Sequence, residues 1–206
     1  MIAVVDYGVN NVKSVVRAIE AGGHAATLVT DAESVRRADR VLLPGVGHFG
    51  QAMRNLAAAG LDDAVRDAAA SGRPVMGICL GLQLFFAGSD EAPDTAGLGL
   101  LPGWVRRFET SLPVPHVGWA EVSASASGRT HPVLAAVFQD TSRFFYHVHS
   151  FHPHALPDEA VLATGDYDGP FPSIAGRDNV IGAQFHPEKS QRAGIDLLAA
   201  FARWRP

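Results

Sequence analysis

Short apolar runs alternate with amphipathic segments through the N-terminal half of this chain, and that alternation restricts the fold more than any other feature. Apolar side chains recur at helical spacing in three segments: residues 51–59, residues 61–70, and an earlier segment that Asn10 or Asn11 can cap. The runs between them, at residues 2–5, 25–29, 41–43 and 74–78, suit strands that are covered on both faces. The pattern predicts an α/β fold with an open, mostly parallel sheet flanked by helices.

The C-terminal half has a different pattern, with short strands separated by turns. Strands are expected at residues 104–108, 117–122 and 144–148, and residues 173–175 and 180–185 read as a hairpin joined through residues 176–179. These strands are expected to be antiparallel additions to the sheet. A closing helix carries apolar residues at Ile195, Leu197, Leu198, Phe201 and Trp204. Because no repeat or linker divides the chain, residues 1–206 are expected to form a single domain.

Composition excludes several classes of partner. The net charge is −4 and Lys and Arg form no cluster, so neither nucleic acid nor an anionic membrane is expected as a partner. No stretch reaches the roughly 18 apolar residues of a membrane span. The first residues enter an apolar run without a charged leader, and we therefore expect a soluble, cytoplasmic protein. Its one cysteine, Cys79, cannot form an internal disulfide.

Cys79 is the first candidate for chemistry. It is the centre of a G-x-C-x-G pattern at residues 77–81, between an apolar strand and a predicted helix. This is the cysteine counterpart of the nucleophile elbow, in which a sharp turn exposes the central residue and the flanking glycines let strand and helix approach closely. Unpaired N–H groups at the start of a helix also stabilise a thiolate. The alternative is a buried structural cysteine.

His186 and Glu188 are the candidates for the base and for the group that orients it. They flank Pro187 after the last predicted strand. A catalytic cysteine needs an imidazole to transfer protons, and the imidazole needs a third group to fix its tautomer. Cys79 and His186 both follow predicted strands, where α/β sheets gather their active sites. Alone, the tripeptide would read as a turn with a solvated glutamate.

Five segments carry a resemblance to a known family: PGVGHFG at residues 44–50, GICLGLQLF at 77–85, HVGW at 116–119, YHVHSF at 146–151 and HPEKS at 186–190. In this order they resemble the class I, or triad, glutamine amidotransferases, and among these the glutaminase subunits of imidazole glycerol phosphate synthases of histidine biosynthesis. The resemblance spans nearly the whole chain. One departure is Asn10, which stands where the family's D-Y-G-x-G-N pattern has its second glycine.

The resemblance implies a role for each matching residue. Cys79 attacks the side-chain carboxamide of glutamine, and His186, steadied by Glu188, protonates the departing ammonia. The oxyanion is expected to be held by backbone N–H groups of Leu80 and of the glycine loop at Val46 and Gly47. Four further residues are implied in binding glutamine: Gly45, Gln83, Ser150 and Phe151.

The resemblance also implies a partner. The sequence has no P-loop, zinc signature or second domain that could activate an ammonia acceptor, and no cofactor or metal is expected. The implied partner is a (β/α)8-barrel cyclase subunit, which forms a heterodimer with the glutaminase and receives its ammonia. Candidate interface residues are Asn11, Trp119, Tyr146 and Lys189. The alternative to an interface role is core packing for the two aromatic residues and solvated surface for the two polar residues.

Other interpretations stay open. His147, His149, His152 and His154 invite a metal site, but Pro153 interrupts their spacing and no acidic or cysteine ligand joins them, which favours strand and loop residues. The chain could serve another synthase, such as that of pyridoxal phosphate synthesis, although the P-G-V-G loop and the lysine after H-P-E argue against it. A partner-independent cysteine hydrolase and a noncatalytic interaction module are the remaining alternatives.

Overall fold

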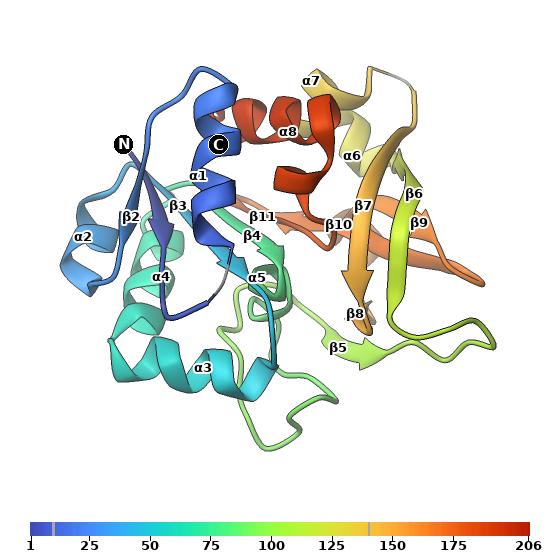
Figure 1. Ribbon diagram of the computed structural model, residues 1–206, viewed down its shortest axis with the longest axis horizontal. Helices are drawn as coiled ribbons and strands as arrows, with labels where there is room; N and C mark the ends of the chain where they lie inside the picture. The colour runs from blue at the N-terminus through green and yellow to red at the C-terminus, as the bar shows by residue number, and fades with distance from the viewer. Residues whose placement is uncertain (10, 140) are drawn as a thin grey trace.

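The computed structural model describes residues 1–9, 11–139 and 141–206 of the chain (Figure 1). Helix capping by Asn10, and the replacement of the usual glycine at that position, lie outside the described residues. No helix in the described part combines the length and apolar character that a membrane crossing requires.

The strands alternate with helices as the sequence pattern predicts. Their bounds are β1 Ile2–Val5, β2 Ala26–Val29, β3 Arg40–Gly45, β4 Val75–Cys79, β5 Trp104–Arg107, β6 His116–Ala124, β7 Arg143–His149, β8 Phe151–His154, β9 Val161–Asp166, β10 Pro170–Arg177 and β11 Val180–Ala183. The helices are α1 Val12–Ala21, α2 Ala32–Arg37, α3 Phe49–Ala58, α4 Leu61–Ala70, α5 Leu80–Gln83, α6 Ala126–Thr130, α7 Pro132–Phe138 and α8 Gln191–Arg203. The described residues also include 3-10 turns at Asp158–Ala160 and Pro187–Lys189.

Within the described residues, nine strands form one open sheet in the order β2-β1-β3-β4-β11-β10-β9-β6-β7. The strands from β2 to β11 pair in parallel, and the pairs from β11 to β7 are antiparallel. A small second sheet joins β5 and β8. The predicted α/β fold with antiparallel additions is therefore confirmed. The predicted hairpin is β10–β11, with only residues 178 and 179 between its strands.

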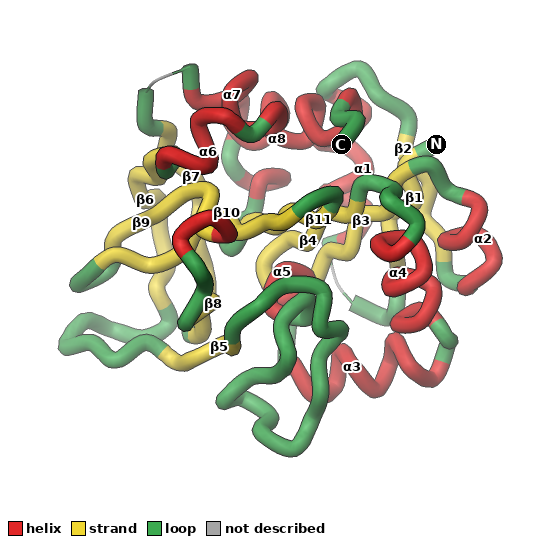
Figure 2. The backbone as a smooth tube through the Cα atoms, turned by 180° about the vertical axis from the view of Figure 1, so that it is seen from behind, coloured by secondary structure: helices red, strands yellow, loops and turns green. Residues whose placement is uncertain are grey.

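Helices cover both faces of the sheet because its central strands are apolar on both sides. On β1, Ile2 and Val4 join the core beneath α1, α7 and α8, whereas Ala3 and Val5 join the core beneath α2, α3 and α4. Figures 1 and 2 show these two helical layers from opposite sides. Figure 2 also shows the long loop between α5 and β5, which lies at the bottom of the view beside α3 and β5.

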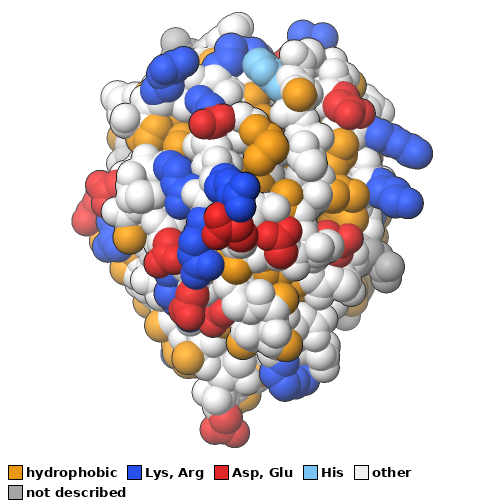
Figure 3. Space-filling model, turned by 90° about the vertical axis from the view of Figure 1, so that its left-hand side faces the viewer, with side chains coloured by type: hydrophobic (Ala, Val, Ile, Leu, Met, Phe, Trp, Pro, Cys, Tyr) orange, Lys and Arg blue, Asp and Glu red, His pale blue; other side chains and the backbone are white. Residues whose placement is uncertain are grey.

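The face around β2 and α2 is charged and carries both signs. Figure 3 shows basic and acidic side chains interspersed there. Arg36 pairs with Asp67 at 2.9 Å, and Arg37 pairs with Glu33 at 2.8 Å. All four side chains are largely exposed, so these pairs contribute little to stability.

Two local predictions need correction. Asn11 occupies the predicted N-cap position of α1, but a cap by its side chain is wrong: the residue has a left-handed backbone with φ 79° and forms no side-chain cap hydrogen bond. Its amide is turned toward Glu188 instead. The predicted helix after Cys79, α5, is a single turn. Leu84, Phe85 and Phe86 are all fully buried, and three consecutive residues cannot all face one side of a continuing helix.

Candidate active site

Cys79 ends β4 in a strained turn. Its backbone has φ 53° and ψ −108°, a conformation that non-glycine residues rarely adopt. The flanking glycines permit this turn, because a Cβ atom on Gly77 would lie 2.6 Å from the backbone N of Leu82 and one on Gly81 would lie 1.8 Å from the carbonyl O of Leu43. The predicted strand-to-turn geometry around Cys79 is therefore confirmed, with the short α5 starting at the next residue.

His186 reaches Cys79 because β11 lies beside β4. The two strands pair in parallel up to Ala183 and Ile78, so the chain leaving β11 passes the end of β4. Three hydrogen bonds then fix the backbone at His186: its N–H donates to the Tyr146 carbonyl at 2.9 Å, its carbonyl accepts from the Ser190 hydroxyl at 2.6 Å, and that hydroxyl accepts from the Tyr146 N–H at 3.0 Å.

Glu188 orients the imidazole. The His186 Nδ1 donates to Glu188 Oε1 at 2.7 Å, and both side chains are almost completely buried. The same oxygen accepts from Asn11 Nδ2 at 2.6 Å. The protonated Nδ1 leaves Nε2 as the working nitrogen, and Nε2 is buried with no hydrogen-bond partner among the described protein groups. The structure thus brings the three predicted catalytic residues into one cluster.

The electrostatics of this cluster favour a charged imidazole. Burial acts against the charge on His186, but the neighbouring Cys79 sulfur and the hydrogen bond and charge of Glu188 together raise the pKa of His186 to about 10. The His186 imidazole is therefore protonated at neutral pH. This is the form that can give a proton to the leaving group of an amide-cleaving reaction.

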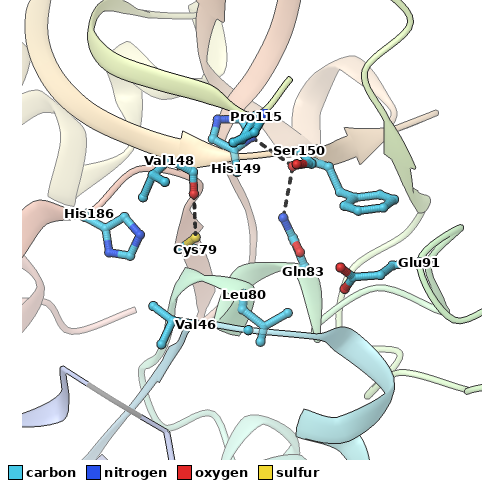
Figure 4. A pocket seen from close by; sticks show the side chains of 12 residues that line it. Val46, Cys79, Leu80, Gln83, Glu91, Pro115, Val148, His149, Ser150 and His186 are labelled. Carbon is cyan, nitrogen blue, oxygen red and sulfur yellow. Dashed lines mark hydrogen bonds between the residues drawn. The ribbon is translucent and has the colours of Figure 1, made fainter. Parts of the chain in front are cut away.

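A cavity of about 280 Å³ opens in front of Cys79 (Figure 4). Its walls include most of the predicted site: Val46, Gly47, Cys79, Leu80, Gln83, Ser150, Phe151 and His186. In Figure 4 the His186 imidazole and the Cys79 sulfur lie side by side on one wall, with Val46 and Leu80 below them and Ser150 and Glu91 on the opposite side. The predicted oxyanion-hole and glutamine-binding residues therefore surround the candidate nucleophile, and their roles stay predictions.

Gly45 is not part of this cavity wall. It ends β3 behind the elbow, where an added Cβ atom would lie 2.7 Å from the Tyr7 hydroxyl and 2.9 Å from the Gly81 backbone N. The Tyr7 hydroxyl donates to the Pro44 carbonyl at 2.9 Å, and burial, followed by the nearby charges of Cys79 and Asp6, raises the pKa of Tyr7. Gly45 thus supports the glycine loop by letting it pass close to the elbow.

Three residues at the site were not predicted to belong to it, although His149 was considered as a metal ligand. Glu91 lines the cavity from the loop after α5 and accepts from the Phe49 N–H at 2.7 Å. His149 lines it from β7, with its Nδ1 donating to the Phe151 carbonyl at 2.9 Å. Gln184 is fully buried beside Cys79 and Gln83. The position of Gln184 two residues before His186, in the Q-F-H-P-E run, could have indicated that it lies at the site. Nothing local in the sequence indicates that Glu91 lies there.

The candidate interface residues fall into two groups. Trp119 on β6 is 47% exposed, and its ring meets that of Tyr146 on β7 edge to face at 6.3 Å between centroids. The Lys189 ammonium lies 5.7 Å from the Tyr146 ring centroid. A core position for Trp119 is therefore wrong, and these three side chains form one surface cluster. Asn11 lies apart from it, bonded to the catalytic glutamate.

The histidines form a packed layer. His116 stacks on His147 at 5.0 Å between centroids, and His149 lies edge-on to His116 at 5.4 Å. Burial lowers the pKa of all three, that of His147 to about 3 with help from the His116 charge. These histidines are therefore neutral aromatic core residues. In the described ranges, no three His, Cys, Asp or Glu side chains are grouped as a metal would require.

Known proteins match the chain over nearly its full length. A relative from Symbiobacterium thermophilum, named imidazole glycerol phosphate synthase subunit HisH, is 47% identical over 202 residues, covering 98% of this chain and 93% of the relative. A protein of the same name from Listeria monocytogenes is 38% identical, covering 98% of this chain and 94% of the relative.

Solved structures share the fold at lower sequence identity. A glutamine amidotransferase crystal structure has a TM-score of 0.74 at 19% identity, covering 96% of this chain and 98% of the other. A chain of PurLQS from Thermotoga maritima has a TM-score of 0.76 at 20% identity, covering 97% and 96%. The family model for class-I glutamine amidotransferases matches residues 3–203. On that match, and with Cys79 and His186 at one cavity and Glu188 bonded to His186 behind it, the chain belongs to the class I glutamine amidotransferase family.

Proposed function

We propose that the chain is the glutaminase subunit of an imidazole glycerol phosphate synthase, which releases ammonia from glutamine at Cys79. The observation that carries the proposal is the arrangement at one cavity of a strained cysteine and a histidine whose Nδ1 is bonded to a buried glutamate at 2.7 Å. The names of the relatives from Symbiobacterium thermophilum and Listeria monocytogenes support the choice of synthase.

The proposed chemistry uses Cys79 as a thiolate and His186 as its proton-transfer partner. The Cys79 thiolate attacks the side-chain carboxamide carbon of glutamine, and the charge moves to the carbonyl oxygen, which backbone N–H groups of Leu80 and Gly47 stabilise. The C–N bond then breaks as His186 Nε2 gives its proton to the nitrogen, and ammonia leaves. Neutral His186 next takes a proton from water, which attacks the thioester, and glutamate departs as the thiolate forms again.

The cavity offers complementary groups to the other end of glutamine. Glu91 supplies a carboxylate on the wall opposite the catalytic pair, which suits the α-ammonium group. The segment at Ser150 and Phe151 supplies polar backbone and hydroxyl groups for the α-carboxylate. Gln83 contributes its carbonyl oxygen, because its Nε2 already donates to the Phe151 carbonyl at 3.0 Å and to Gln184 Oε1 at 3.2 Å.

The partner is proposed to be a (β/α)8-barrel cyclase subunit that docks on the surface cluster of Trp119, Tyr146 and Lys189 to form a heterodimer. Ammonia released into water becomes protonated and loses its nucleophilicity, so a docked acceptor site is chemically required for efficient transfer. The large exposed indole of Trp119 is typical of an interface anchor.

Replacing Cys79 tests the glutaminase assignment in the complex with the synthase. We expect Cys79→Ala to abolish product formation from glutamine while synthesis from added ammonium salts continues, because only ammonia production depends on the thiol. Loss of both activities together would contradict the assignment and indicate a structural cysteine.

Replacing Trp119 tests the docking surface. We expect Trp119→Ala to weaken binding to the synthase subunit by about 30-fold or more, as truncation of a buried aromatic anchor does. The matched control is Leu28→Ala on β2, an exposed apolar residue at the opposite edge of the sheet. Equal affinity of the wild type and both variants, measured by titration calorimetry, would contradict the proposed face.

A further inference from the structure

The Cys79 sulfur has two polar neighbours that the chemistry above leaves unused. The Val148 carbonyl oxygen lies 3.9 Å from Sγ and accepts a hydrogen bond from the thiol form. The Gln184 side-chain Nε2 lies 3.8 Å from Sγ and donates to it. A carbonyl oxygen favours the protonated sulfur, whereas an N–H donor favours the thiolate. The two neighbours therefore act on the sulfur in opposite directions.

The orientation of the Gln184 amide is fixed by a chain of hydrogen bonds. Gln83 Nε2 donates to the Phe151 carbonyl, which can only accept, so this end of Gln83 must be its NH2 group. The same Nε2 donates to Gln184 Oε1 at 3.2 Å. Turning the Gln184 amide over would set two NH2 groups against each other, so its own NH2 group must face Sγ. The Gln184 side chain is fully buried, so no water competes for the contact.

The backbone holds Gln184 just as firmly. Gln184 directly follows β11, and its backbone N–H donates to the Ser173 carbonyl at 2.8 Å. Two residues later the chain reaches His186. One short segment after β11 thus places both the His186 imidazole and the Gln184 amide near the Cys79 sulfur.

We propose that Gln184 is a further catalytic residue, whose side-chain N–H donates to the Cys79 thiolate and keeps the sulfur ionised for attack on the substrate. The proposal rests on the proposed glutaminase function and adds a second donor to the pair of Cys79 and His186. Gln83 has a supporting role in it, because it fixes which face of the Gln184 amide meets the sulfur.

Other titratable groups also surround the sulfur. His186 approaches it from the segment after β11, Tyr7 from the segment after β1 and His149 from β7, while Glu188 lies behind His186 and Glu91 lies across the cavity. Substitutions at Gln184 or Gln83 leave these five titratable residues in place. A change in the ionisation of Cys79 in such a variant can therefore be assigned to the loss of the side-chain amide.

The test is the pH dependence of Cys79 alkylation by iodoacetamide in the full chain. Cys79 is the only cysteine, so the rate of carbamidomethylation reports the thiolate fraction without a second reacting thiol. We expect Gln184→Met to lower the rate about tenfold on the acid side of the profile and to move its midpoint up by about one pH unit, as loss of a hydrogen bond to a charged group does. Met keeps the length and volume of the side chain but has no donor.

The matched comparison is Gln83→Met. It removes the amide that orients Gln184, so the Gln184 amide can turn over and its donor faces the sulfur only part of the time. The alkylation midpoint should therefore move up by less than in Gln184→Met. Its KM for glutamine should rise, because Gln83 lines the cavity. A wild-type midpoint in Gln184→Met, or a shift in Gln83→Met that equals or exceeds the shift in Gln184→Met, would overturn the proposal, since either result would mean that the Gln184 donor does not keep the sulfur ionised.

Gln184→Glu is the second variant, in case the apolar substitution prevents folding. It has the size of glutamine and keeps an oxygen for Gln83, but it replaces the donor with an acceptor, so the midpoint should move up further than in Gln184→Met. An unchanged midpoint in folded Gln184→Glu would also overturn the proposal. Alkylation requires neither glutamine nor the synthase, so its failure leaves the glutaminase assignment to be judged by the Cys79→Ala experiment.

Discussion

Replacing Gly81 by alanine should disable the nucleophile by moving it rather than by changing its chemistry. The added Cβ atom would lie 1.8 Å from the Leu43 carbonyl oxygen, whereas real Cβ contacts stay beyond 3.0 Å. The elbow and β3 must therefore separate by about 1.2 Å. Both contacting groups are backbone, so no flexible side chain can yield. A misplacement of about 1 Å at a reacting group costs roughly 100-fold in rate, and overpacking of this kind costs about 1–3 kcal/mol in stability.

The assay is the rate at which Cys79 is labelled by a glutamine-mimicking electrophile, measured beside the thermal unfolding midpoint. We expect Gly81→Ala to be labelled about 100-fold more slowly than the wild type while still unfolding cooperatively. The control is Gly60→Ala before α4, where the backbone has φ 63° but an added Cβ atom meets nothing within 4 Å. It should lose about 1 kcal/mol to backbone strain and keep its labelling rate. Labelling of Gly81→Ala at the wild-type rate would refute the steric argument.

Two further predictions concern pH. The pKa of His147 is lowered to about 3 by burial, so the unfolded chain binds the extra proton below about pH 6.5. The contribution of neutral His147 to the free energy of unfolding is complete above pH 6.5 and is lost as the pH falls toward 3. At pH 5 we expect urea unfolding to show a loss of about 2 kcal/mol from this residue, and His147→Gln should remove that loss. Unchanged acid sensitivity in the variant would contradict the account. His186 stays protonated until the pH rises through about 10, so the alkaline limb of glutaminase activity in the complex should lie there. Glu188→Gln removes a charge that raises this pKa and should move the limb to lower pH; an unmoved limb would show that Glu188 does not tune the imidazole.

The sequence predicted the parts of the site whose signals are local. The G-x-C-x-G pattern and the H-P-E tripeptide each specify a turn at a strand end, and parallel neighbours bring such ends together. The structure adds the detail that Cys79 itself adopts positive φ, between two glycines where a Cβ atom would clash with the neighbouring backbone.

Contacts between distant segments escaped prediction because no local pattern encodes them. Asn11 looked like a helix cap or an interface residue, yet it bonds Glu188 across 177 positions of sequence. Glu91 sits in an irregular loop whose path depends on tertiary packing, and it meets the Phe49 N–H 42 positions away. Gln184 stood next to the recognised tripeptide, but its contact with a sulfur 105 positions away became visible only once β11 was paired with β4.

The central claim is that Cys79 attacks the glutamine carboxamide with His186 as its proton-transfer partner. Mass spectrometry of the chain after incubation with a glutamine-mimicking electrophile, in the complex with the synthase subunit, tests it most directly. The account predicts one adduct, on Cys79, and at least a 100-fold slower reaction in His186→Ala. Continued hydrolysis of glutamine by a chain in which Cys79 stays unmodified would contradict it.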